Sequence, residues 1–151
     1  MDQETTILSY LEEFRRDIEP DFSFLRQYGF SGPTCTVTPF GYYAVYRSSK
    51  VWLCVAVEHR EGGLNIKVGR VDTATQRWPE ERWFGEPYVF PAVRADMLQL
   101  LFTRDRDSAD RIVVLMRDLT NREEQLEAQG LFAKALRDHF ESVLRGEVLF
   151  G

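Results

Sequence analysis

The side chains best suited to nucleophilic or metal chemistry in this chain are two cysteines and two histidines, Cys35, Cys54, His59 and His139. Cysteine-based zinc sites usually combine C-x-x-C pairs, and the chain has none. It also lacks the H-E-x-x-H motif of metalloproteases and the G-x-S-x-G motif of hydrolases. We therefore expect reduced cysteines, no catalytic residues, no metal or other cofactor, and a protein that is not an enzyme.

Charge is concentrated at the N-terminus. Residues 1–21 contain seven acidic side chains and two arginines, so their formal charge of −5 equals that of the whole chain. Nucleic acid is disfavoured as a partner, because phosphate binding needs clustered Lys and Arg. An acidic helix face is most often simply solvated, and the functional alternative is a basic protein partner that contacts Glu12 and Glu13.

The composition is that of one globular domain. The chain has 151 residues, 44% of them hydrophobic, which is enough for a single core, and we expect one domain over residues 1–151. No apolar run approaches the roughly 20 residues of a membrane helix, and the acidic N-terminus does not resemble a signal peptide. We expect a cytoplasmic protein without a membrane partner.

Residues 1–30 predict two helices. Apolar residues recur at helical spacing in the first, namely Ile7, Leu11, Phe14 and Ile18. Pro20 is expected to end this helix. A short second helix follows, with Asp21 as its N-cap, Gly29 as the left-handed residue after its last turn, and Phe30 as the apolar residue beyond.

Residues 31–70 predict an antiparallel β-meander. Two-residue turns at Phe40-Gly41, Ser48-Ser49 and Glu61-Gly62 place most of the aliphatic residues on one face of the sheet. That face collects Cys35, Val37, Tyr42, Ala44, Tyr46, Val51, Leu53, Val55, Val57, Leu64, Ile66 and Val68. The opposite face collects Thr36, Thr38, Tyr43, Val45, Trp52, Cys54, Ala56, Glu58, Asn65 and Lys67. Cys54 therefore lies on the other face from both Cys35 and His59, which excludes a disulfide and a Cys–His dyad.

An aromatic segment follows the meander. Residues 71–93 contain Trp78 and Trp83 among several prolines, and part of the segment, Arg82 to Phe90, could add an edge strand. These rings either cover a core that the sheet leaves open or form a pocket or partner surface over its second face.

The last third of the chain predicts three helices. Pro91 fits the first turn of one, whose apolar stripe is Val93, Met97, Leu98 and Leu101. Another starts near Ser108. Thr120 to Glu123 matches a capping box for a last helix that runs to Arg145, with Gly146 as its stop. Its inward residues are expected to be Leu126, Leu136, Phe140 and Val143. The fold class is thus α+β, an antiparallel meander of four to five strands with two N-terminal and three C-terminal helices packed mainly on one face.

The segment from Asp21 to Arg70 has a family resemblance. The helix FSFLRQYGF followed by the hairpin YRSSKVWLCVAVEH…LNIKVGR resembles small uncharacterised bacterial α+β proteins, some of which resemble the immunity proteins that neutralise secreted toxins. The resemblance implies a protein partner and no catalytic residues.

These observations predict a protein-binding module, an immunity-type or chaperone-like partner of another bacterial protein. The candidate contact residues are Tyr43, Trp52, Cys54, Lys67, Trp78, Trp83, Glu12 and Glu13. One alternative is a homodimer that uses the second sheet face as its interface. The other is a small-ligand binder, or an enzyme of unrecognised type, with a pocket between that face and the aromatic segment. Its polar groups would come from Tyr43, Cys54, Asn65 or Lys67.

Overall fold

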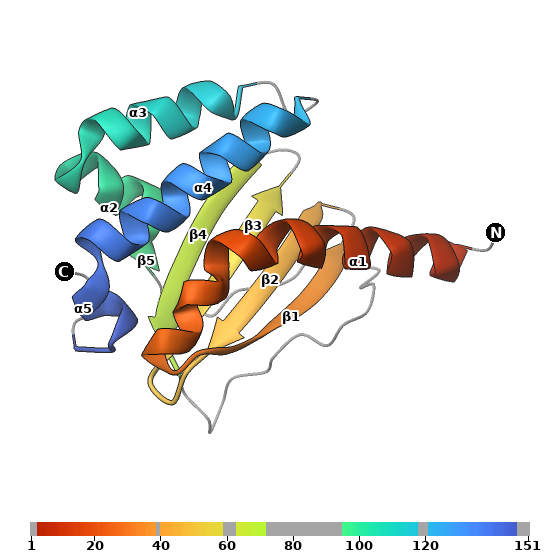
Figure 1. Ribbon diagram of the computed structural model, residues 1–151, viewed down its shortest axis with the longest axis horizontal. Coiled ribbons are helices and arrows are strands. Elements are labelled where there is room, and N and C mark those ends of the chain that lie inside the picture. The colour runs from red at the N-terminus through yellow and green to blue at the C-terminus, as the bar shows by residue number, and fades with distance from the viewer. Residues whose placement is uncertain (1–2, 39, 59–62, 72–94, 118–120, 148–151) are drawn as a thin grey trace.

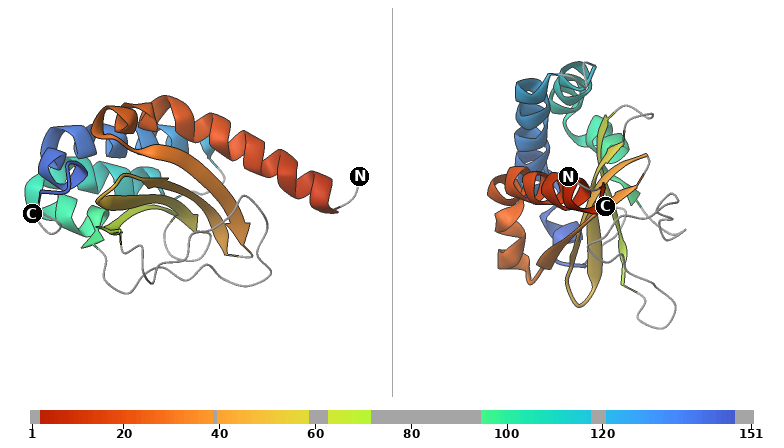
Figure 2. Two further views of the ribbon diagram at one scale, coloured as in Figure 1. Left: turned by 90° about the horizontal axis from the view of Figure 1, so that it is seen from below. Right: turned by 90° about the vertical axis from the view of Figure 1, so that its right-hand side faces the viewer.

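The computed structural model describes residues 3–38, 40–58, 63–71, 95–117 and 121–147. It has two layers, a five-stranded antiparallel sheet and a set of helices that cover one of its faces (Figures 1 and 2). The predicted α+β meander is confirmed.

The sheet is a simple meander in which each strand pairs with the next in the sequence. Its strands are β1 (Ser31–Thr38), β2 (Gly41–Arg47), β3 (Val51–Glu58), β4 (Gly63–Arg70) and β5 (Ala95–Asp96). The fifth strand has only two residues and pairs with Lys67 and Val68 of β4. The strand predicted within Arg82 to Phe90 lies outside the described residues.

The predicted hairpin registers are wrong by two residues in each case. Thr38 pairs with Gly41, Arg47 with Trp52, and Glu58 with Gly63. The predicted turns required Pro39 opposite Tyr42, Arg47 opposite Lys50 and Arg60 opposite Gly63. A shift of two residues leaves every side chain on the same face, because side chains alternate with a period of two. The alternation in the sequence therefore determines the faces and leaves the register undetermined.

Both predicted faces are confirmed. The face toward the helices belongs to the main hydrophobic core, where Cys35, Leu53, Val55 and Ile66 are fully buried. The opposite face carries a second, smaller apolar cluster made of Tyr43, Val45, Trp52, Cys54 and Ala56.

Helix α1 (Gln3–Phe22) is longer than predicted, because Pro20 lies inside it rather than ending it. The helix continues to Phe22, whose fully buried side chain packs in the core together with Ile18. The short helix that follows, η1 (Ser23–Tyr28), is a 3₁₀ helix with Phe22 as its N-cap, so the prediction of Asp21 as the cap is wrong.

The end of η1 is as predicted. Gly29 has a left-handed backbone with φ of 84°, and its N–H donates to the Arg26 carbonyl. The next N–H, that of Phe30, donates to the Leu25 carbonyl, and the Phe30 ring is buried. Gly29 avoids the steric penalty that a Cβ would bring at this backbone angle.

Four helices form the C-terminal part, α2 (Met97–Arg104), α3 (Arg106–Leu115), α4 (Arg122–His139) and α5 (Glu141–Leu144). The start predicted near Ser108 is found within one turn, with Asp105 as the N-cap that accepts a hydrogen bond from the Ser108 N–H. Helix α4 is capped by Asn121, which accepts from the Glu124 N–H, one residue after the predicted cap Thr120.

The helix expected to run to Arg145 is two helices. It breaks at Phe140, whose backbone angles of −126° and 25° are not helical, and α5 follows. Phe140 is fully buried, so the break turns its ring into the core. Pro91 and Val93 lie outside the described residues. Over the described helices, none is both long and apolar enough to cross a membrane.

A candidate binding groove between α1 and α4

A groove of about 300 Å³ lies between α1 and the start of α4. Both helices lie on the same side of the sheet, and α1 extends past the sheet at its N-terminal end (Figures 1 and 2). The floor of the groove is formed by Val57 and Leu64 at one end of β3 and β4, together with Met116. It therefore has an apolar base and two helical walls.

The α1 wall consists of Tyr10, Glu13, Phe14 and Asp17. Their spacing of three, four and seven residues places them on one side of the helix, next to the core residues Leu11 and Ile18. The Phe14 ring packs on Tyr42 of β2, with ring centroids 5.4 Å apart. Aromatic rings thus line the part of the groove nearest the N-terminal end of α1.

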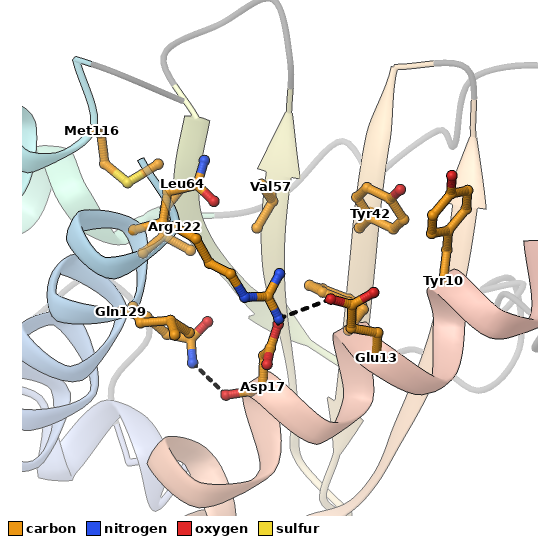
Figure 3. Close-up of a pocket in the computed structure, with 12 residues that line it drawn as sticks. Tyr10, Glu13, Asp17, Tyr42, Val57, Leu64, Met116, Arg122 and Gln129 are labelled. Carbon is orange, nitrogen blue, oxygen red and sulfur yellow. Dashed lines mark hydrogen bonds and ion pairs between the residues drawn. The ribbon is translucent and has the colours of Figure 1, made fainter. Parts of the chain in front are cut away.

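The α4 wall begins with Arg122, whose guanidinium reaches across to α1 (Figure 3). Its Nη2 atom lies 3.1 Å from Oε1 of Glu13 and also pairs with Oδ2 of Asp17. The Arg122 and Glu13 side chains are 54% and 51% exposed, and that of Asp17 is 25% exposed. The ion pair spans the rim of the groove and is largely in water.

Gln129, two turns further along α4, makes the buried connection between the two walls. Its side-chain N–H₂ donates to the Asp17 carbonyl at 2.7 Å and to the Asp21 carboxylate at 2.9 Å. Only 5% of Gln129 is exposed. Because buried amides must be hydrogen-bonded, these contacts hold α4 against α1 independently of Arg122.

Two large apolar side chains are exposed at the groove. Tyr10 on α1 is 50% exposed and Leu126 on α4 is 37% exposed. The prediction that Leu126 faces inward is wrong. Leu126 lines the groove and is not part of the core. The residues on α4 that do enter the core come later in the helix, among them Phe132 and Leu136.

The predicted contact residues of the sheet lie on the face away from the groove, where three are buried and Lys67 is partly buried. Tyr43, Trp52 and Cys54 are at most 2% exposed, and the Lys67 side chain is 13% exposed. Trp52 packs directly on its cross-strand neighbour Gly69, where a Cβ would come within 2.5 Å of the indole ring. The Trp52 ring is therefore part of the second apolar cluster of the fold.

Glu58 joins two of these residues in a polar cluster. The Tyr43 hydroxyl donates to Oε2 of Glu58 at 3.2 Å, and Lys67 Nζ lies 4.0 Å from Oε1. Burial, and then the nearby Glu58 charge, raise the pKa of Tyr43 to about 12. Burial also raises the pKa of the Cys54 thiol well above its usual range. Both groups are neutral near pH 7, so neither is activated as a nucleophile.

The remaining predicted residues fall in different places. Glu12 is exposed on α1, outside the groove, whereas Glu13 belongs to its rim. Trp78 and Trp83 lie outside the described residues. The prediction missed Tyr10 and Arg122. The spacing of Tyr10, Glu13, Phe14 and Asp17 could have indicated one helix side, but nothing local links them to Arg122 more than 100 residues later.

Cys35 and Cys54 are free and buried. Within the described part of the chain, no group of three or more His, Cys, Asp and Glu side chains is placed to hold a metal ion. The arrangement at the groove is suited to binding, with an apolar base, aromatic rings and a charged rim.

The chain was also compared with known proteins. No protein-family model, curated protein or solved structure matches it.

Proposed function

We propose that this protein is a protein-binding module of the immunity or chaperone type, and that its partner docks on the groove between α1 and α4. The observation that supports the proposal is the combination of a half-open cavity with exposed apolar side chains on both walls, Tyr10 and Leu126. Exposed aromatic and aliphatic groups beside a pocket are the usual anchors of a protein interface.

Charge supports a basic partner surface. The whole net charge of the chain, −5, is carried by residues 1–21, and residues 3–21 belong to α1. The groove therefore lies beside the negative part of the molecule, and complementary charge steers a positively charged protein toward it. Part of this charge is paired within the protein, since Glu13 and Asp17 contact Arg122 and Glu19 contacts Arg26.

The test starts with affinity enrichment from the source organism and continues with purified components. The tagged protein is used to identify candidate partners, and each candidate is then titrated against wild type and a groove variant, Tyr10→Ser with Leu126→Gln. We expect the groove variant to weaken binding at least about tenfold, because both apolar anchors are removed.

The chain offers a matched control, Leu8→Ser with Val113→Gln. Leu8 is 49% exposed and Val113 is 38% exposed, against 50% for Tyr10 and 37% for Leu126. Leu8 is on the same helix as Tyr10 but about 160° around it, and Val113 is on α3. If both double variants weaken binding equally, or neither does, the groove is not the docking site.

A further inference from the structure

The Arg122 side chain occupies a position that a basic side chain of a partner could take. Two carboxylates, Glu13 and Asp17, converge on the same nitrogen of its guanidinium at the rim of the groove (Figure 3). We propose that Arg122 is an internal occupant of a cation site, and that docking replaces it with an arginine or lysine of the partner protein. This inference rests on the proposed function.

Replacing Arg122 at Glu13 costs little because that ion pair is exposed, while the Asp17 carboxylate is 25% exposed. More than half of the Arg122 and Glu13 side chains is in water, and exposed ion pairs contribute little to stability. Releasing Arg122 leaves its guanidinium solvated, and the two helices remain connected through the buried amide of Gln129. The groove can therefore open its rim without losing its walls.

The aromatic lining suits the rest of such a side chain. Phe14 and Tyr42 are in ring contact, and both line the same groove as the two carboxylates, as does Tyr10. The methylene groups of an arginine or lysine pack well along such rings, whose faces also attract the cationic head. A leucine of the partner would meet the rings but leave the carboxylates unused.

Charge argues against an acidic ligand at the same place. The three rim groups, Glu13, Asp17 and Arg122, sum to −1, and α1 behind them carries further negative charge. A carboxylate that approached Arg122 would meet two carboxylates already bound to it, and like charges at close range repel.

The experiment uses three small probes on the full-length chain labelled with ¹⁵N, namely the Nα-acetyl amides of arginine, leucine and glutamate. Each is titrated while chemical shifts are followed, with the side-chain amide signals of Gln125 and Gln129 as reporters inside the groove. We expect the arginine probe to shift these signals at lower concentration than the other two, and the shifts to weaken as salt is added.

Two variants test the exchange. Glu13→Gln should weaken binding of the arginine probe about threefold, because one carboxylate is lost, and Arg122→Gln should strengthen it about threefold, because the internal competitor is removed. An anion site gives the opposite sign for Arg122→Gln.

The ion pair between Arg111 and Glu127 supplies matched controls. Its N to O distance is also 3.1 Å and its side chains are 55% and 52% exposed, but it joins α3 to α4 outside the groove. Arg111→Gln and Glu127→Gln should leave the affinity for the arginine probe unchanged. If they change it as much as the rim variants do, the effect is one of overall charge and the proposal fails.

Other outcomes would contradict the replacement of Arg122 by a partner side chain without deciding whether a protein docks in the groove. Tighter binding of the glutamate probe, lost in Arg122→Gln, would make the groove an anion site. Equal binding of the arginine and leucine probes, or no shift with any probe, would remove charge recognition. In each of these cases the Tyr10 and Leu126 variants still decide independently whether a protein docks there.

Discussion

The groove on the helix-covered side of the sheet and the opposite face of the sheet have the same kinds of side chain in different surroundings. At the groove, Glu13 and Arg122 are about half exposed and 3.1 Å apart, whereas on the opposite face Glu58 and Lys67 are 21% and 13% exposed and 4.0 Å apart. Tyrosines lie beside both pairs. An exposed pair costs little to break and can exchange with a ligand, but a largely buried one belongs to the fold.

The aromatic residues of the two regions also differ in their exposure. Trp52 is 1% exposed and fills the second face, while Tyr10 is 50% exposed at the groove. Residue type alone favoured the tryptophan as an interface anchor, since tryptophan is enriched at such sites. Exposure instead favours Tyr10 for the proposed docking, because a buried ring cannot touch a partner without a rearrangement of its surroundings.

The largest expected effect is that of Trp52→Ala. Removing a fully buried indole should reduce the free energy of unfolding by about 3–5 kcal/mol, and Tyr10→Ala should change it by less than about 1 kcal/mol. Urea denaturation of the two variants measures both values. Similar losses for the two would mean that the second face is not part of the core.

A smaller effect is expected where Trp52 lies on Gly69. A Cβ at Gly69 would come within 2.5 Å of the ring, so Gly69→Ala should destabilise the protein by about 1–3 kcal/mol. At Gly130, within α4, a Cβ would meet only Asp21 at 3.7 Å, and Gly130→Ala should stabilise by about 0.5–1 kcal/mol. Thermal unfolding should therefore show melting temperatures that move in opposite directions. A Gly69→Ala protein as stable as wild type would exclude the tight contact.

The pH dependence of stability should report the buried thiol on the helix-covered face. Burial raises the pKa of Cys35 from 9.0 to about 11, although Arg15 partly opposes the shift. The folded state thus favours the neutral thiol. The stabilisation that this preference adds to the free energy of unfolding is complete below pH 9 and is lost as pH rises from about 9 to 11. The full effect is on the order of 2 kcal/mol.

The variant Cys35→Ala isolates this contribution from the tyrosines, which also ionise at high pH. The difference in free energy of unfolding between wild type and Cys35→Ala, from urea denaturation at several pH values, should shrink over pH 9–11. A difference that stays constant across this range would show that the thiol ionises alike in the folded and unfolded chains.

The smallest effect on stability is expected for Arg122→Gln. The ion pair with Glu13 is exposed and the one with Asp17 is exposed on the Arg122 side, so the free energy of unfolding should fall by no more than about 1 kcal/mol. Urea denaturation beside Arg111→Gln gives the measurement and its matched control. A loss above about 2 kcal/mol for Arg122→Gln alone would mean that Arg122 is a fixed part of the structure and too costly to exchange.

Most of the fold was predictable because it depends on local patterns. Alternation over residues 35–68 assigned both sheet faces, and Gly29 marked the end of η1. Details that depend on small local differences in energy were not predictable. The hairpin registers differ by two residues from those predicted, which moves each turn by one residue, and α4 is capped by Asn121 instead of Thr120. Helix α1 passes through Pro20 and continues to the buried Phe22.

The candidate site was much less predictable. Glu13 was selected for its charge, but its partner Arg122 and the neighbouring Tyr42 are distant in sequence and come together only through packing. Trp52, Tyr43 and Cys54 were selected for their residue types on the correct face, and their burial could not be read from that alternation.

By itself, then, the sequence determined which residues share a helix side or a sheet face, because backbone geometry repeats over a few residues and apolar side chains follow that repeat. It also determined that the negative charge belongs to the first helix. Only the tertiary structure decided which polar and aromatic groups are in water. Exposure depends on how α1, α4 and the sheet pack, and that packing joins residues such as Glu13 and Arg122 that have no local relation in the chain.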